Sequence, residues 1–406
     1  MKRSFSLRTV AFTVSGTALI AVTYGLVRLA YGLFLPDVQR DLDLAAAAAG
    51  WVSAGASGCY CIGALAGFLL ARAHARSLVV AAALAAATGA LGMAASPGTG
   101  VFAIAAVVGS ASAGLASPAL VRLVGERTSR VDDHRDDDHR ADEHRAARLQ
   151  AAVNAGTGPG LVVAGVLALV LLPDWRTAWA WSGIAAVVVG AAVLLTVGRS
   201  AGPAPEQRVT PDRAWSRAHV RPVVVALLFG TGTASVWTFG RSVLVDAGAG
   251  TTASVLLWVA VGLGGAAVTV TARWTAPLGA LTVWRVTVLA TAGAVVVLGA
   301  FPGAGVLPLV AGAVFGWGYT AGTGALIAWT TEIAPERSAA GTAVLFVVLV
   351  LGQAVGAAGL GAVLGVGGPA LTFLFAAVVT LLAVAGTVRR RAPGRADLEL
   401  PPVPGV

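Results

Sequence analysis

The stretch YGLVRLAYGLFLPD, from Tyr24 to Asp37, decides how the rest of the sequence is interpreted. It closes the first long apolar run of the chain and carries Arg28 inside that run. On an α-helix Tyr24, Arg28 and Tyr31 share one face, because side chains three and four residues apart are neighbours. An arginine at the centre of a membrane helix costs about 2.5–3.5 kcal/mol, so its face must look into protein or into a water-filled cavity. We therefore predict that this face lines a path for a substrate.

The composition excludes an ordinary soluble domain. Of the 406 residues 57% are hydrophobic and only 12% are charged, whereas soluble domains are about 25% charged. The net charge of +9 lies in short segments between apolar runs, which is typical of cytoplasmic loops and does not indicate a nucleic-acid surface. We predict an all-α membrane protein with twelve transmembrane helices in two six-helix, pseudo-symmetric halves. The apolar segments of about 20 residues are Thr9–Leu35, Ala47–Ala71, Ser77–Ala95, Gly100–Leu120, Ala151–Leu172, Trp175–Val197, Val220–Val245, Thr252–Ala272, Gly279–Ala300, Leu307–Trp329, Gly341–Leu364 and Pro369–Val388.

The distribution of basic residues predicts the orientation of the chain. Nearly all arginines fall on one side of the predicted spans, so both termini are expected in the cytoplasm. Arginine far outnumbers lysine, which is typical of a high-GC bacterial genome, and we expect a multi-pass protein of the bacterial cytoplasmic membrane. Arg199–Arg221 contains three prolines and no apolar periodicity, which indicates a linker. The predicted parts are an N-terminal half (1–198), a cytoplasmic linker (199–219), a C-terminal half (220–388) and a cytoplasmic tail (389–406).

A repeat interrupts the first half. Val131–Arg145 reads VDDHRDDDHRADEHR, a five-residue unit with a histidine in each copy. We interpret it as a low-complexity, solvated loop, with weak binding of Zn²⁺ or Ni²⁺ as the alternative. A helix repeats every 3.6 residues, so a period of five does not keep the three histidines on one face.

Two short motifs and the predicted topology resemble the major facilitator superfamily of transporters over essentially the whole chain. In GFLLARAHAR, between the second and third segments, Gly67, Arg72 and Arg76 match the superfamily's loop motif, whereas its aspartate is replaced by alanine. In NAGTGPGLVVAG, Gly158 and Pro159 match the Gly-Pro pair of the superfamily's antiporters. Proline kinks a membrane helix and glycine permits close packing. The resemblance assigns gating roles to these five residues.

The opening stretch and VWTFGRSVLVDAG, in the seventh segment, resemble a poorly characterised actinobacterial-type branch near the YbfB-type and cyanate-type permeases. This resemblance implies a monomeric secondary transporter. A small-molecule substrate would bind near the bilayer midplane, and the two halves would rock around it within the lipid bilayer. The resemblance also implies a proton as the coupling ion, and neither a cofactor nor a metal.

Seven residues are candidates for substrate binding. Arg28 is the first, with snorkelling to the interface as its alternative. Arg241 is the second, with snorkelling or a local ion pair with Asp246 as its alternatives. This arrangement resembles that of superfamily members that clamp an anion between arginines on the first and seventh helices. The remaining candidates are the aromatic side chains Tyr24, Tyr31 and Trp237 and the amides Asn154 and Gln353.

Two functions stay open at this point. The superfamily favours proton-coupled export of a small organic solute. Uptake or exchange of a small organic anion, bound by Arg28 and Arg241, has the better physical argument, because no span is expected to hold a buried Asp or Glu. An integral-membrane enzyme is not expected, because outside the repeat His74 and His219 are isolated and flanked by arginines.

Overall fold

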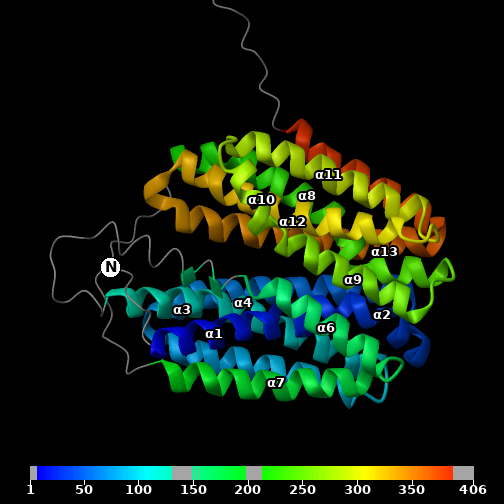
Figure 1. Ribbon diagram of the computed structural model, residues 1–406, viewed down its shortest axis with the longest axis horizontal. Coiled ribbons are helices and arrows are strands. Elements are labelled where there is room, and N and C mark those ends of the chain that lie inside the picture. The colour runs from blue at the N-terminus through cyan, green and yellow to red at the C-terminus, as the bar shows by residue number, and fades with distance from the viewer. Residues whose placement is uncertain (1–6, 130–148, 151, 154, 198–212, 387–406) are drawn as a thin grey trace, which may run out of the picture.

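The computed structural model describes residues 7–129, 149–150, 152–153, 155–197 and 213–386. Within these ranges the regular elements are all helices, and no strand is present. The helices run side by side in two layers, with the N-terminal helices in one and the C-terminal helices in the other (Figure 1). The predicted all-α fold is therefore confirmed.

Each layer corresponds to one half of the chain. The N-terminal helices are α1 (Leu7–Ile20), the π-helix η1 (Ala21–Leu29), α2 (Ala30–Leu42), α3 (Ala46–Ala94), α4 (Thr99–Ser129), α6 (Thr157–Leu171) and α7 (Trp175–Thr196). The C-terminal helices are α8 (Arg213–Asp246), α9 (Thr251–Ala266), α10 (Val268–Thr275), α11 (Ala280–Ala300), α12 (Leu307–Ile333), the 3₁₀-helix η2 (Pro335–Arg337) and α13 (Ser338–Ala385).

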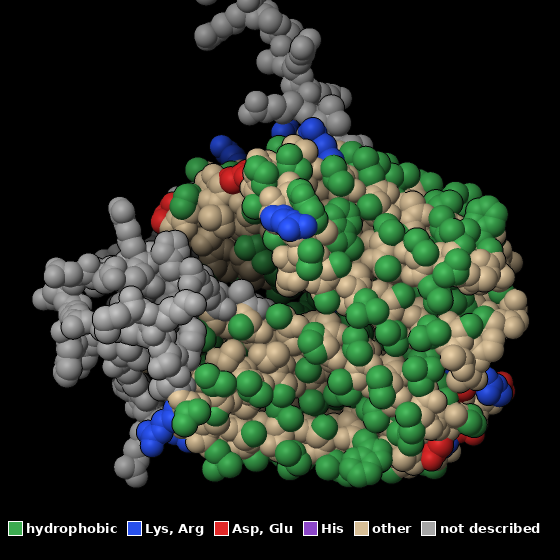
Figure 2. Space-filling view, viewed as in Figure 1, with side chains coloured by type: hydrophobic (Ala, Val, Ile, Leu, Met, Phe, Trp, Pro, Cys, Tyr) green, Lys and Arg blue, Asp and Glu red, His purple; other side chains and the backbone are tan. Residues whose placement is uncertain are grey.

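The outer surface of the two layers is apolar. Large hydrophobic side chains such as Leu195 and Val366 are 87% and 92% exposed, and hydrophobic side chains cover the flank of the molecule (Figure 2). Among the described residues, eight helices are long and apolar enough to cross a membrane, and α6 is a shorter apolar helix. A surface of this kind is stable only against lipid, so the chain is a multi-pass membrane protein.

Two long helices each contain two predicted spans. Helix α3 covers both the second and the third predicted spans and bends at His74, where φ is −131° and ψ is 29°. Helix α13 covers the last two and breaks at Gly368, where φ is 72°, a conformation that only glycine adopts readily. The total of twelve spans stays a prediction.

Two of the differences from the predicted boundaries concern the interface between the layers. The first span was expected to end at Leu35, but α2 continues through Pro36 to Leu42. The helix continues through the proline instead of ending there, so Asp37 is a helical residue and is buried. At the start of the second half, α8 begins at Arg213, inside the segment predicted as linker.

The two layers meet most closely at one end of the molecule. We name this the distal end, where α2 ends at Leu42 and α8 ends at Asp246, and we name the opposite end, where α8 begins, the linker end. Near the distal end a methyl group on Gly32 would collide with the carbonyl of Trp237 in the other layer. At the linker end the surface is hollowed between the layers (Figure 2). The structure is therefore closed distally and open toward the linker.

Candidate functional site

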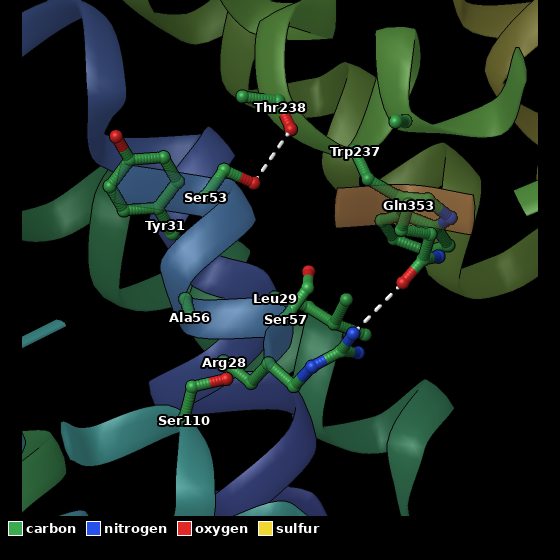
Figure 3. A pocket seen from close by; sticks show the side chains of 11 residues that line it. Arg28, Leu29, Tyr31, Ser53, Ala56, Ser57, Ser110, Trp237, Thr238 and Gln353 are labelled. Atoms are coloured by element: carbon green, nitrogen blue, oxygen red, sulfur yellow. Dashed lines mark hydrogen bonds between the residues drawn. The ribbon is translucent and has the colours of Figure 1, made fainter. Parts of the chain in front are cut away.

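A cavity lies between the two layers and draws on both of them. It comprises about 400 Å³ of space not filled by protein atoms, including the part open to solvent. One wall comes from η1, α2, α3 and α4 and the other from α8 and α13 (Figure 3). Its lining residues are Arg28, Leu29, Tyr31, Ser53, Ala56, Ser57, Ser110, Ala234, Trp237, Thr238 and Gln353.

Arg28 reaches this cavity from the last turn of the π-helix η1. A π-turn uses i→i+5 hydrogen bonds, and here the N–H of Ala30 donates to the carbonyl of Gly25. Gly25 itself lies against Gly160 of α6, because a methyl group on it would come within 2.6 Å of the Gly160 Cα. π-helical segments are rare and frequently occur at functional sites, and this one carries the one charged side chain among the described residues that line the cavity.

The guanidinium of Arg28 has two neighbours and neither is an acid. Its Nη2 donates to Gln353 Oε1 at 2.8 Å, and its Cζ lies 4.5 Å from the centre of the Tyr60 ring. Among the described residues, no carboxylate pairs with it. The cavity therefore holds a positive charge that is stabilised by an amide and an aromatic face only.

The amide of Gln353 has a defined orientation. Arginine only donates hydrogen bonds, so the atom that faces Arg28 must be the amide oxygen. The amide nitrogen then donates to the Tyr319 hydroxyl at 3.0 Å. Arg28 belongs to the N-terminal layer, whereas Gln353 and Tyr319 belong to the C-terminal layer, so this chain of bonds links the two layers across the cavity.

The two predicted tyrosines lie beside Arg28, but their hydroxyls already have partners. Tyr31 lines the cavity and donates to the carbonyl of Ala49 at 2.9 Å. The Tyr24 and Tyr60 hydroxyls are 3.0 Å apart, and their rings pack edge to face. Tyr24 therefore supports the ring beneath Arg28 and is absent from the cavity lining.

Trp237 presents a donor without a partner. Its ring is fixed edge to face against Trp258, Phe315 and Tyr319, with ring centres 5.1–6.3 Å away. Its Nε1 is buried and has no hydrogen-bond acceptor among the described residues. The same holds for the Oγ of Ser110, which points toward the Arg28 side chain in Figure 3. The cavity thus contains two unused hydrogen-bonding groups.

Arg241 lies outside the cavity lining and carries a compensated charge. It is 1% exposed and forms an ion pair with Asp37 of α2. It also donates to the Leu33 carbonyl at 2.7 Å and to Ser254 Oγ at 3.1 Å. The alternatives of snorkelling and of a pair with Asp246 are wrong, because α2 continues past Pro36 and places Asp37 against Arg241. The expectation that the spans hold no buried carboxylate is wrong for the same reason.

The predicted gating residues lie on the helix surfaces between neighbours in the first layer. Gly67 of α3 is buried, and a methyl group on it would come 2.9 Å from Pro118 of α4. Arg72 and Arg76 flank the bend of α3 at His74 and are half-buried. None of the three reaches the cavity lining.

The Gly-Pro pair lies at the start of α6. Gly158 faces α9, where the carbonyl of Gly262 would be 3.7 Å from an added methyl group, and Pro159 is exposed. The pair is thus placed between the two layers. Asn154, the remaining candidate for substrate binding, and the repeat Val131–Arg145 lie outside the described residues.

Sequence reasoning did not identify the hydroxyl groups of the cavity. Ser53 and Thr238 bond to each other across the layers at 3.0 Å, and Ser57 and Ser110 are buried on α3 and α4. A single serine in a span rich in alanine and glycine does not indicate a binding site, because a serine hydroxyl can also bond to the backbone of its own helix.

Outside the cavity, the remaining candidate for chemistry is structural. His219 is 2% exposed; its Nδ1 is 2.9 Å from the Trp215 carbonyl and its Nε2 is 2.7 Å from Thr330 Oγ1. Both ring nitrogens thus have partners, Nδ1 within α8 and Nε2 between α8 and α12. In the part of the chain that the structure describes, no group of three His, Cys, Asp or Glu side chains could hold a metal ion.

Comparison with known proteins gives a family and a fold. The family model described as "Uncharacterised MFS-type transporter YbfB" matches residues 20–389. No curated protein sequence matches the chain.

Three solved structures illustrate the shared fold. The nucleoside transporter NupG has a TM-score of 0.70 at 13% identity, over 93% of this chain and 98% of that one. A POT family transporter in complex with 5-aminolevulinic acid has 0.72 at 10%, over 93% and 94%. The D-xylose-proton symporter has 0.68 at 15%, over 93% and 95%. At these identities the similarity concerns the fold alone.

Proposed function

Because the chain belongs to the major facilitator superfamily of transporters, in the YbfB-type family, we propose that it carries a small organic anion bound by Arg28. The observation that supports this proposal is the composition of the cavity. Arg28 is its one charged lining residue, and no acid faces it among the residues that line the cavity. A secondary transporter binds its substrate between the halves, which is where this cavity lies.

The chemistry of the guanidinium suits an anion. Arginine stays charged and offers a planar fork that a carboxylate or phosphate can bind with two parallel hydrogen bonds. In this structure one Nη atom is bonded to the neutral Gln353 oxygen. An anion would replace a neutral acceptor by a charged one, which adds the attraction of opposite charges to the hydrogen bonds. The predicted clamp of two arginines reduces to Arg28, since Asp37 already neutralises Arg241.

For direction and coupling, we keep proton-coupled export as the proposal, with uptake or exchange as its alternative. Both termini and the basic loops are proposed to face the cytoplasm, and on that proposal the linker end, where the molecule is open, would be the cytoplasmic end. Asp37 is the one carboxylate less than 9% exposed among the described residues, and it lies between the two layers. Flux of a labelled anion in proteoliposomes, with and without a pH gradient, would distinguish the two directions.

The test of the anion site uses Arg28→Lys and Arg28→Ala. The lysine keeps the charge but loses the fork, so affinity for an anionic substrate should fall about tenfold, equivalent to about 1.4 kcal/mol. The alanine should abolish transport without lowering the melting temperature, because it removes a costly intramembrane charge. Normal transport by Arg28→Ala would refute the anion site. Arg217→Ala is the control, because Arg217 is an exposed arginine of α8 that does not line the cavity.

A further inference from the structure

The cavity contains more recognition chemistry than one anion anchor needs. The Trp237 Nε1 is buried without an acceptor among the described residues, and an indole N–H can only donate. Leaving a buried donor unpaired is unfavourable. The Ser110 Oγ is unpartnered in the same sense, on a residue that is 1% exposed. Both residues line the cavity together with Arg28.

Four other polar side chains of the lining already have partners. Ser53 and Thr238 bond to each other, and the Tyr31 hydroxyl donates to a carbonyl. Gln353 accepts from Arg28 and donates to Tyr319. A ligand that pairs both the Arg28 charge and the Trp237 N–H must therefore offer an anionic group to Arg28 and a hydrogen-bond acceptor to Trp237.

The lining also indicates what a substrate must lack. None of the residues that line the cavity is an Asp or Glu, so an ammonium group would find no counter-charge there. One face of the Tyr60 ring is occupied by the Arg28 guanidinium. Burying an unpaired ammonium is costly, which disfavours amino acids and peptides.

On the premise of the proposed function, we infer that the substrate is an organic acid without an ammonium group that carries a second acceptor, such as an oxo group, for Trp237. Arg28 stands on η1 in the N-terminal layer and Trp237 on α8 in the C-terminal layer. Such a ligand would bridge the two layers, with the carboxylate on one and the oxo group on the other. Ser110 would supply a further hydroxyl close to Arg28 (Figure 3).

Three acids of one chain length test this inference on the purified full chain. Valerate has only the carboxylate, levulinate adds an oxo group, and 5-aminolevulinate adds an ammonium group to levulinate. Binding is measured by isothermal titration calorimetry. Levulinate should bind about fivefold to tenfold more tightly than valerate, the effect of one hydrogen bond. 5-Aminolevulinate should bind at least about tenfold more weakly than levulinate, since its ammonium group is unpaired.

The variant Trp237→Phe removes the N–H and keeps an aromatic ring among its neighbours. It should abolish the preference for levulinate over valerate and change valerate binding less than about twofold. Trp258→Phe is the matched control, because the Nε1 of Trp258 is also buried without a partner among the described residues, but Trp258 does not line the cavity. It should keep the preference.

The outcomes separate this inference from the proposed function. If Arg28→Ala loses all binding but the preference is absent or survives in Trp237→Phe, the second acceptor is refuted and the anion site stands. If Arg28→Ala binds the acids as the wild type does, or if no acid binds the wild type, both proposals are refuted. Tighter binding of 5-aminolevulinate than of levulinate would overturn the exclusion of ammonium groups.

Discussion

Removing Asp37 should open the distal end of the protein. The carboxylate lies on α2 and pairs with Arg241 on α8, so it joins the two layers where they are closed. Arg241 is 1% exposed and Asp37 is 5% exposed, and the pair is therefore shielded from water. In the alternating-access scheme the layers must separate at this end, and separation must break the pair.

The size of the effect follows from the burial of the pair. Removing one partner of a buried ion pair costs about 3–5 kcal/mol, because the other charge stays behind unpaired. Arg241 retains its bonds to Leu33 and Ser254, so we take the lower figure for Asp37→Ala. A change of about 3 kcal/mol shifts an equilibrium about a hundredfold at 1.4 kcal/mol per factor of ten. The distally open form should therefore become prominent.

Spin labels at the distal end would measure the shift. Ala45, before α3, and Thr252, near the start of α9, are exposed and belong to different layers. Double electron–electron resonance between labels at these positions, in a chain with Cys59 and Cys61 replaced, should show a longer distance in Asp37→Ala. An unchanged distance distribution would refute the idea that the pair holds the distal end closed.

Two further variants separate the closing role from a role in folding. Asp41→Ala is the matched control, since Asp41 pairs with Arg176 inside the N-terminal layer and both side chains are more than a third exposed. It should leave the distance unchanged, because a pair within one layer cannot hold two layers together. The double variant Asp37→Ala/Arg241→Met should recover the melting temperature, since no charge is left unpaired, yet remain open. Opening of similar size in Asp41→Ala would contradict the assignment.

Two smaller predictions concern packing and capping. Gly50→Ala should also disfavour the closed distal end, because its methyl group would collide with the carbonyl of Ala357 in the other layer. Gly58→Ala should not, because a methyl group there would meet open space. The same spin-label distances measure both variants. Asp174 caps α7 and accepts from Thr177, whose side chain and backbone N–H lower the pKa of the carboxyl. The cap should contribute about 1 kcal/mol to the stability of the folded protein. This contribution should be fully present above the pKa of aspartate in the unfolded chain, about 3.9, and should be lost as the pH falls through the lower pKa of the folded state. Melting temperatures of the wild type and of Asp174→Ala, measured against pH, would show the loss.

The sequence was sufficient for the architecture because hydropathy and charge act over whole segments. Runs of apolar residues require helices in a membrane, and one arginine within such a run requires a polar surrounding. Arg28 and Gln353 do meet, although they are far apart in the chain. The sequence predicted that each of the two residues lies in a membrane span, but not that they contact each other.

The partner of Arg241 could not be predicted for a specific structural reason. Proline is an ordinary helix terminator, so Asp37 was expected in a loop and Asp246 seemed the nearest acid. The continuation of α2 past Pro36 depends on packing against α8, which the sequence does not reveal. The same applies to Ser110 and to the Trp237 N–H, whose importance lies in the absence of a partner among the described residues. A missing contact has no sequence pattern.

The two arginines at the layer interface show how charge compensation divides the roles. Arg241 has a carboxylate of its own, and the resulting pair favours one conformation of the chain. Arg28 has no carboxylate partner among the described residues; it contacts the Tyr60 ring and the amide of Gln353, which reaches it from the opposite layer. A substrate anion would displace this amide, so its net gain is the difference between a charged and a neutral acceptor and not a whole ion pair. That difference keeps binding moderate, which transport requires because the substrate must also leave. Binding of the anion would also replace the hydrogen bond between the two layers, from Arg28 to Gln353, by hydrogen bonds from Arg28 to the substrate.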